Sequence, residues 1–169
     1  MIRNQWYAVL ESHEVKKGKL LGVIRMGERM LLWRNEQGAV VCLKDQCPHR
    51  GVQLSKGKIV DGHVQCPFHG LEFDEGGNCV YAPALGRATT DTAKYNAYSY
   101  PVQEAHDFIY IFWGTVTNGQ ELPLLEWVDD LPDDEFVFTT VVDHWKVDYS
   151  RVIENQLDVA HIPFIHRTT

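Results

Sequence analysis

The sequence predicts a mainly β protein of antiparallel sheets, followed by the strand and helix that begin an α+β region. Short apolar runs separated by turn residues extend from Leu20 to about Trp113, which is typical of antiparallel strands joined by tight turns. Between residues 115 and 135, two prolines and a run of aspartates interrupt this pattern and indicate a connecting segment. We therefore predict a β domain at residues 1–115 and, at residues 116–169, the connecting segment with the start of a second, truncated domain.

Four hairpins are expected in the β domain, and in each of them turn residues separate two apolar runs. The paired runs are residues 30–33 with 39–43, 58–60 with 63–65, 71–73 with 79–81, and 98–102 with 108–112. The second hairpin has the strongest turn signal, because Asp61-Gly62 is a pair favoured in the primed two-residue turns that match the twist of the strands.

The second region is expected to contain a strand at residues 136–145 and a helix from Asp148 to about His161. Asp148 and Ser150 are both candidate N-caps, since a short polar side chain can accept a hydrogen bond from the free N–H groups of the first turn. Pro163 should end or kink this helix, because proline lacks a backbone donor and disfavours helical geometry in the residue before it.

Composition and charge exclude several classes of function. The chain has 169 residues, of which 44% are hydrophobic and 23% charged, as in an ordinary soluble globular protein. A net charge of -7 argues against a surface that binds nucleic acid. The first residues lack the basic start and apolar core of a signal peptide, and no run approaches the length of a membrane span. We therefore expect a cytoplasmic protein that binds neither nucleic acid nor a membrane.

Two segments, Cys47-Pro48-His49-Arg50-Gly51 and Cys66-Pro67-Phe68-His69-Gly70, share one thiolate donor, one imidazole donor and a following glycine. A two-iron, two-sulfur cluster with two Cys on one iron and two His on the other needs this arrangement if each loop supplies one ligand to each iron. Proline stiffens each loop, and glycine lets amide N–H groups turn toward the sulfurs. The predicted cluster ligands are Cys47, His49, Cys66 and His69.

A zinc site is the alternative, because two Cys and two His are also good zinc ligands. Common zinc sites pair Cys with Cys and His with His in separate arms, whereas the two types are mixed within each arm here, which favours the cluster. The remaining cysteines, Cys42 and Cys79, lie within or at the start of apolar runs, and we interpret them as buried structural residues. Four cysteines are also too few for a disulfide framework in a chain of this length.

These two segments resemble the ligand loops of Rieske proteins, and in particular those of the oxygenase branch. Rieske proteins of bc-type complexes carry an additional disulfide between the loops. The matching positions here are Val52 and Phe68, so the bc-type alternative is excluded. Replacing two thiolates by neutral imidazoles makes such a cluster easier to reduce, with potentials of about -150 to +300 mV across the class. The resemblance therefore implies transfer of single electrons.

A second group of polar residues lies on the expected helix. Asn155, Asp158 and His161 follow one another at intervals of three residues, which places them in one stripe of a helix. A polar stripe in so apolar a helix indicates a buried site, and the break at Pro163 offers a way to bring His166 beside it. Two His and one carboxylate on one iron are the oxygen-activating ligands of non-heme Fe(II) enzymes. A pair of His at a helix end, without a metal, is the alternative.

Residues 154–166 resemble the Asn-x-x-Asp-x-x-His-x-x-x-x-His segment of Rieske non-heme iron oxygenases. The likeness is greatest to their monooxygenase and O-demethylase group, to which dicamba monooxygenase and vanillate demethylase belong. It implies that His161 and His166 bind a mononuclear Fe(II), with Asn155 near the iron either as a weak ligand or without a direct bond to it. It further implies that Asp158 links an iron-bound His to a Rieske His of a neighbouring chain in a homotrimer.

The same resemblance implies partners and a reaction. Electrons would come from a reductase or ferredoxin, and dioxygen would be used to hydroxylate or O-demethylate a small aromatic substrate. In the family the third iron ligand is an aspartate of a downstream domain, and no acidic residue follows His166 in this sequence. We therefore expect the chain to be part of a longer oxygenase and to be inactive by itself. A stand-alone Rieske ferredoxin is the alternative, although it gives no role to residues 136–166.

Overall fold

The computed structural model describes residues 1–86, 92–116, 121–125, 139 and 141–166. The chain divides into two compact units, Met1–Leu125 and Glu126–Thr169, and each unit is described by itself. The strands of the first unit are β1 (Gln5–Glu11), β2 (Leu21–Arg25), β3 (Glu28–Arg34), β4 (Val40–Lys44), β5 (Lys58–Val60), β6 (His63–Gln65), β7 (Glu72–Phe73), β8 (Cys79–Tyr81), β9 (Ser99–Tyr100), β10 (Val102–Ala105) and β11 (Phe108–Trp113). Short 3₁₀ helices are η1 (Ser12–Glu14), η2 (Leu54–Lys56), η3 (Pro83–Leu85) and η4 (Ala93–Tyr95).

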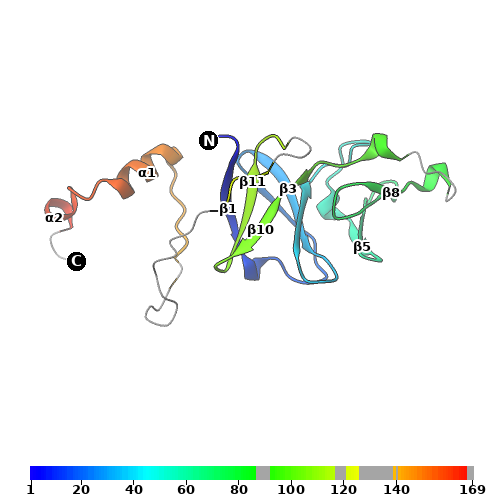
Figure 1. The fold of residues 1–169 in the computed structure, drawn as a ribbon, viewed down its shortest axis with the longest axis horizontal. Helices are drawn as coiled ribbons and strands as arrows, with labels where there is room; N and C mark the ends of the chain where they lie inside the picture. The colour runs from blue at the N-terminus through cyan, green and yellow to red at the C-terminus, as the bar shows by residue number, and fades with distance from the viewer. Residues whose placement is uncertain (87–91, 117–120, 126–138, 140, 167–169) are drawn as a thin grey trace. The chain divides into compact units, whose positions relative to one another are not determined.

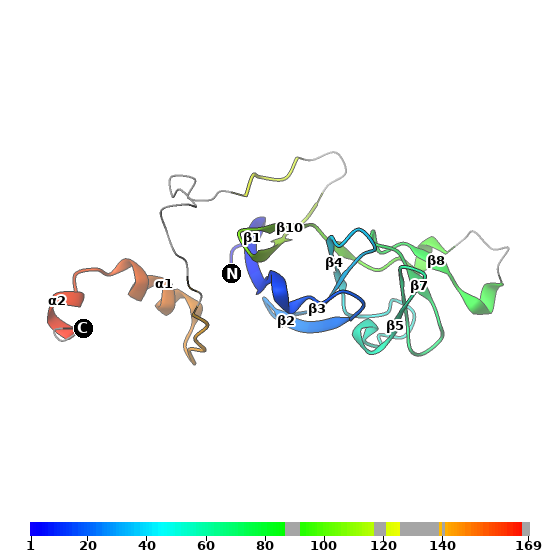
Figure 2. The same ribbon diagram turned by 90° about the horizontal axis from the view of Figure 1, so that it is seen from below.

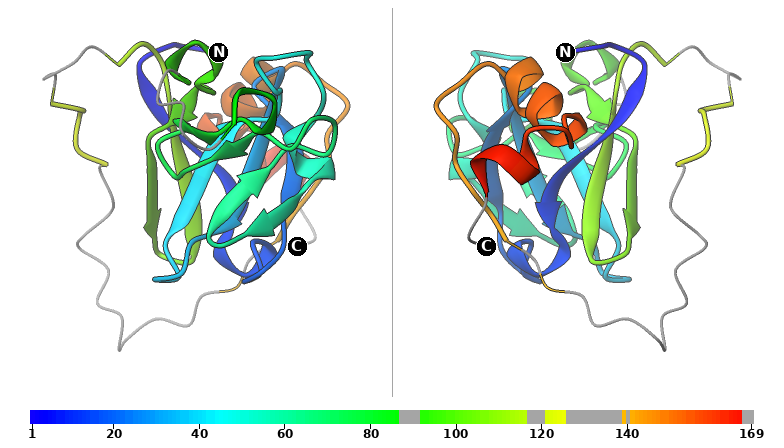
Figure 3. Two further views of the ribbon diagram at one scale, coloured as in Figure 1. Left: turned by 90° about the vertical axis from the view of Figure 1, so that its right-hand side faces the viewer. Right: turned by 90° about the vertical axis from the view of Figure 1, so that its left-hand side faces the viewer.

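These strands form three antiparallel sheets, with strand orders β1-β11-β10, β2-β3-β4-β9 and β5-β6-β7-β8. The third sheet lies at the end of the unit away from β1 (Figures 1 and 2). Seen from that end, its strands stand in front of the second sheet (Figure 3, left). The predicted fold class, mainly β with antiparallel sheets and a smaller two-loop subdomain, is confirmed.

The central strands β3 and β4 are buried on both faces, which is why they read as unbroken apolar runs. Alternate residues of β3 point into two different cores. Met30 and Leu32 pack in a core with the first sheet, beside Ile109 and Ile111 of β11. Leu31 and Trp33 pack in a second core that also contains Cys47 and Cys66. The central sheet therefore joins the body of the unit to the segments that carry the predicted cluster ligands.

Three of the four predicted hairpins are confirmed. β3 pairs with β4, β5 with β6, and β7 with β8. At the turn between β5 and β6, Asp61 and Gly62 have φ of 48° and 80°, the positive values that a primed turn requires. The predictions did not include β1 and β2.

The fourth hairpin is correct only in part. Val102–Ala105 pairs with β11 as expected, but Ser99 and Tyr100 pair with β4 in the second sheet. Pro101 separates the two pairings, because proline has no N–H for the ladder and the strand can change sheets there. Its carbonyl still accepts a hydrogen bond from Phe112 N at 3.0 Å.

The second unit contains two helices among its described residues, α1 (Tyr149–Leu157) and α2 (Ile162–Ile165). Asp148 is the N-cap of α1, and its side chain accepts a hydrogen bond from Ser150 N at 3.0 Å. The predicted helix to His161 is too long, because α1 ends at Leu157. Pro163 does not end that helix; it lies in the first turn of α2, where a missing N–H costs no helical hydrogen bond.

The predicted strand at residues 136–145 is wrong in its described part. Residues 139 and 141–145 have no strand pairing, and residues 136–138 and 140 lie outside the described residues. Their side chains are exposed, and a strand needs a partner to satisfy its backbone groups. No described helix is long and apolar enough to span a lipid bilayer.

Candidate metal centre

Two loops of the first unit fold in the same way. In the first, which follows β4, Cys47 N donates to Val52 O at 2.7 Å and Gly51 N donates to Cys47 O at 2.8 Å. In the second, between β6 and β7, Cys66 N donates to Leu71 O at 2.8 Å and Gly70 N donates to Cys66 O at 3.1 Å. The glycines have φ of 73° and 71°, a conformation that is costly for other residues. Backbone hydrogen bonds within each loop therefore hold its Cys-x-His or Cys-x-x-His segment in a closed turn.

The two loop cysteines are brought together inside the core. Cys47 and Cys66 are each 2% exposed and both are free thiols, in hydrogen-bonding contact with each other. Burial raises the pKa of Cys47 to about 11, and the neighbouring thiol adds to this, while the backbone N–H groups of His49 and Arg50 act in the opposite direction. A thiol buried as Cys47 is becomes a thiolate only when a bound cation compensates its charge.

The two loop histidines lie together as a second pair. The ring centroids of His49 and His69 are 4.6 Å apart. Nδ1 of His49 is buried and has no hydrogen-bond partner, which is costly for a polar atom unless something else occupies it. His69 is exposed and stacks at 4.0 Å against Phe68, whose side chain is 59% exposed. The imidazole pair is thus nearer to the surface than the thiol pair.

The donor set fits a binuclear cluster. It consists of one thiol pair and one imidazole pair, and a Rieske cluster uses two Cys on one iron and two His on the other. No group of three or more His, Cys, Asp and Glu residues among the described residues is arranged to hold a single metal ion. The unpartnered nitrogen of His49 and the amide N–H groups directed at Cys47 are further features that a ligated cluster would use.

Two residues near this site were missed by sequence reasoning. Tyr95 of η4 presents its ring edge-to-face to His49, at 5.8 Å between centroids. Asp45 is 2% exposed and accepts hydrogen bonds from Ser55 N at 2.7 Å, Ser55 Oγ at 2.6 Å and Gln53 Nε2 at 3.3 Å. Asp45 therefore ties the end of β4 to η2, on either side of the first loop. A single acid after a strand carries no sequence signal for this role.

The second predicted group is only partly assembled. His161 Nδ1 lies 3.4 Å from Asp158 Oδ2, and the rings of His161 and His166 are 5.5 Å apart. Asp158 and His161 lie beyond the end of α1, so they do not form a helical stripe with Asn155. Asn155, Asp158 and His166 are exposed, which corrects the expectation of a buried site. The turn after Leu157 and the short helix α2 instead bring His161 close to Asp158 and to His166.

Comparison with known proteins identifies the family. Residues 5–101 match the Rieske [2Fe-2S] domain, and the chain belongs to this family, which confirms the predicted cluster type. It is 36% identical over 172 residues to the oxygenase component of dicamba O-demethylase from Stenotrophomonas maltophilia, covering 98% of this chain and 48% of that protein. The chain thus spans about half the length of that relative, and a quarter of another curated relative. The predicted resemblance to the N-terminal portion of such oxygenases is confirmed.

Solved structures agree with this assignment. A crystal structure of dicamba monooxygenase with non-heme iron and dicamba matches with a TM-score of 0.62 and 42% identity, over 67% of this chain and 34% of that one. The oxygenase of carbazole 1,9a-dioxygenase, in a reduced complex with its ferredoxin, matches with a TM-score of 0.61 and 32% identity, over 68% of this chain and 30% of that one. These likenesses concern oxygenase components.

Proposed function

We propose that this chain is the electron-transfer portion of a Rieske non-heme iron oxygenase. The observation that carries the proposal is the presence of two separate ligand groups in one chain. One is the paired loops of the first unit, and the other is the cluster of Asp158, His161 and His166 in the second. A stand-alone ferredoxin needs only the first group. The match to an oxygenase component over 98% of the chain supports the same proposal.

In this proposal Cys47 and Cys66 bind one iron of the cluster, and His49 and His69 bind the other. The bound cluster supplies one-electron chemistry at a potential of about -150 to +300 mV. The protein contributes the N–H groups of His49 and Arg50, which point at the Cys47 sulfur and stabilise its negative charge. Burial of both cysteines keeps water from the thiolate side.

Electrons enter at the imidazole side in this proposal. His69 and Phe68 are exposed at the tip of the second loop, so a donor protein can approach the ligand histidines without unfolding the loop. A reductase or a ferredoxin is the expected donor, and the ferredoxin complex of the carbazole oxygenase supports this choice. The exposed tip of the second loop therefore gives electrons a short path from the protein surface to the cluster.

The acceptor in the proposal is a mononuclear Fe(II) bound by His161 and His166, with Asn155 nearby. Asp158 already contacts His161 Nδ1 at 3.4 Å, and a carboxylate in this position fixes the orientation of the imidazole. Its other oxygen can accept a hydrogen bond from a Rieske histidine of a neighbouring chain in a homotrimer. The third ligand and the pocket for a small aromatic substrate, which is hydroxylated or O-demethylated with dioxygen, belong to parts of the protein outside these residues.

The test is an iron count on the longer protein in which this chain occurs. We expect about three irons per chain, two in the cluster and one mononuclear. The variant His161→Ala should lose only the mononuclear iron and keep the electron paramagnetic resonance signal of the reduced cluster. His144→Ala is the matched control, because His144 is an exposed histidine of the same unit, and it should retain all of the iron.

Two irons per chain in the unaltered protein, with no change in His161→Ala, would instead favour the ferredoxin. Loss of the cluster in His161→Ala would contradict the assignment of the two ligand groups. Oxygen consumption with a chemical reductant and aromatic acids or ethers then narrows the substrate class.

A further inference from the structure

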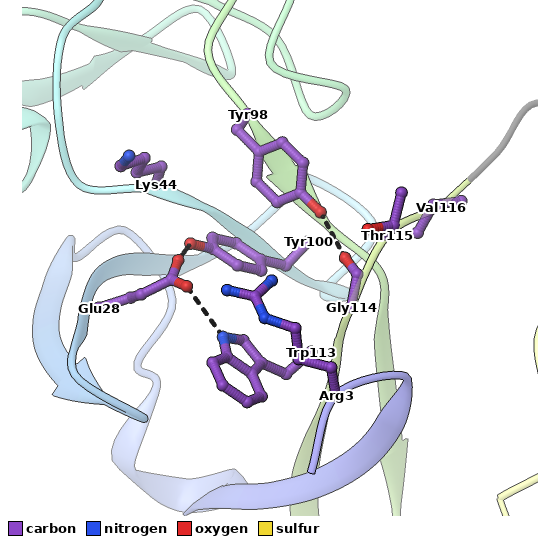
Figure 4. Close-up of a pocket in the computed structure, with 9 residues that line it drawn as sticks. All are labelled: Arg3, Glu28, Lys44, Tyr98, Tyr100, Trp113, Gly114, Thr115 and Val116. Carbon is purple, nitrogen blue, oxygen red and sulfur yellow. Dashed lines mark hydrogen bonds between the residues drawn. The ribbon is translucent and has the colours of Figure 1, made fainter. Parts of the chain in front are cut away.

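A surface pocket of about 350 Å³ lies in the first unit, where the N-terminal segment meets the end of β11 (Figure 4). Its side chains come from five separate parts of the chain: Arg3, Glu28, Lys44, Tyr98 with Tyr100, and Trp113. None of them belongs to either ligand loop. The volume is at the lower end of the range for small-molecule sites, which is about 300 to 1,000 Å³. The pocket is therefore large enough for a ligand with a single ring.

One of the lining residues, Glu28, is a fixed carboxylate. Glu28 Oε1 accepts a hydrogen bond from Trp113 Nε1 at 2.9 Å, and Glu28 Oε2 accepts one from the Tyr100 hydroxyl (Figure 4). Burial by itself would raise the pKa of Glu28, but these bonds and the charges of Lys44 and Arg3 outweigh it, so that the pKa lies below its usual value. Both oxygens of the ionised group are thus occupied by neutral donors.

Arg3 is held beside the pocket by its neighbour in the chain. Asn4 N donates to Trp113 O at 2.8 Å, and Asn4 Oδ1 accepts from Thr115 N at 3.0 Å. A Cβ on Gly114 would lie 2.3 Å from Asn4 Oδ1, so the N-terminal segment and the end of β11 fit closely only with glycine there. The Arg3 guanidinium consequently rests over the Trp113 ring, 4.6 Å from its centroid. The cation is positioned before any ligand arrives.

The pocket is positive in a chain that is otherwise acidic. Two cations, Arg3 and Lys44, and one carboxylate, Glu28, line the pocket, whereas the whole chain has a net charge of -7. Glu28 accepts its hydrogen bonds from Tyr100 and Trp113 and not from either cation. The donors of Arg3 and Lys44 are therefore available for an anion, and the rings of Tyr98 and Tyr100, 4.8 Å apart at their centroids, supply an aromatic wall.

We propose that this pocket binds a small carboxylate carried on a single aromatic ring. The carboxylate is recognised by Arg3 and Lys44, because charge-assisted bonds to a carboxylate are the stronger kind and a guanidinium can make two in parallel. The ring rests against Tyr98 and Tyr100. Binding here is independent of the cluster and of the proposed mononuclear iron.

The test uses the 169-residue chain loaded with its oxidised cluster and follows the Trp113 indole N–H resonance by ¹H–¹⁵N correlation spectroscopy. Benzoate should shift this resonance in a saturable way. Benzamide, which has nearly the same shape without the charge, should bind at least about tenfold more weakly, as expected for loss of a charge-assisted bond. Ligand-free spectra of every variant show whether the fold is intact.

Arg3→Gln and Lys44→Gln should each weaken benzoate binding by at least about fivefold. Lys17→Gln is the matched control, because Lys17 is an exposed lysine outside the pocket, and it should bind benzoate as the unaltered chain does. Equal affinity for benzamide and benzoate would overturn the proposal. So would unchanged benzoate binding in both Arg3→Gln and Lys44→Gln, because the charges would then have no part in recognition.

Discussion

The two units of this chain hold their proposed ligand residues in different ways. In the first, the loop cysteines are 2% exposed and belong to a core shared with β3 and β4. In the second, no residue of α1 or α2 is buried, and His161 and His166 are brought together by a turn and a short helix. The first group is fixed by tertiary packing, whereas local backbone geometry brings the residues of the second together.

This difference indicates what each region requires. A cluster site with four protein ligands in two self-closed loops can be complete within one compact unit. A mononuclear site needs at least one more ligand and a dry cavity, and neither is supplied by two exposed helices. The apolar residues Ile153, Leu157 and Phe164 of these helices are also exposed.

The largest effect is expected from removing one thiol of the first unit. Cys47→Ser should reduce the iron content from about two atoms per 169-residue chain to nearly none, because a serine hydroxyl is a poor ligand for cluster iron. Iron and acid-labile sulfide analysis, with the visible absorption spectrum, measures the loss.

Cys79→Ser is the control for this substitution. Cys79 is 3% exposed and lies in the same core, so it experiences the same change of atom in a similar environment. The Cys79→Ser variant should keep its iron. Equal iron contents in the two variants would mean that the first unit does not bind a cluster through Cys47.

A second contrast concerns backbone opening. Amides of β3, where residues 30–33 are fully buried, should exchange with deuterium at least about a thousandfold more slowly than those of α1, because exchange of buried strands needs a larger unfolding event. Mass spectrometry of the cluster-loaded 169-residue chain gives both rates in one experiment. Comparable protection in α1 and β3 would show that the second unit is packed as firmly as the first.

A smaller difference is expected between the contributions of two ion pairs, one in each unit, to the free energy of unfolding. Arg34 Nη2 and Nη1 hold the two oxygens of Glu104 at 2.7 and 2.9 Å and join β3 to β10, and this hydrogen bonding lowers the pKa of Glu104. Because the folded-state pKa is depressed, the stabilisation is complete above the ordinary pKa of 4.5 and is lost as the pH falls through the folded-state value. Glu104→Gln should therefore lower the free energy of unfolding by about 1 kcal/mol at pH 7.

Urea unfolding at a series of pH values measures this effect, and the difference from the unaltered chain should shrink as the pH is lowered toward 4. Glu154→Gln is the matched control. Glu154 pairs with Arg151 three residues away at 2.6 Å, with both side chains well exposed, and such pairs contribute little. A larger loss in Glu154→Gln than in Glu104→Gln would reverse the contrast between the two units.

Local sequence signals predicted local structure well. Asp61-Gly62 fixed its hairpin because two residues determine a primed turn, and Asp148 capped α1 because the cap bonds only two residues away. The composition of the two loops was sufficient to predict the cluster type, since thiol and imidazole donors alternate within short segments.

Features that depend on distant residues were missed. β1 pairs with β11, more than ninety residues along the chain, and no hairpin signal reports such a pairing. Tyr95 reaches His49, and Asp45 reaches Ser55, only through the folded loops. In the second unit, the predicted helical stripe of Asn155, Asp158 and His161 was wrong. Periodicity assumes that the helix continues, whereas α1 ends at Leu157.

Electron nuclear double resonance on the reduced chain containing ¹⁵N-labelled histidine shows whether one histidine from each loop binds the same iron. We predict two strongly coupled histidine nitrogens in the unaltered chain. In His69→Cys we predict one, together with a lower reduction potential, because a thiolate replaces a neutral imidazole. A spectrum without coupled histidine nitrogen, or one that is unchanged in His69→Cys, would contradict the account.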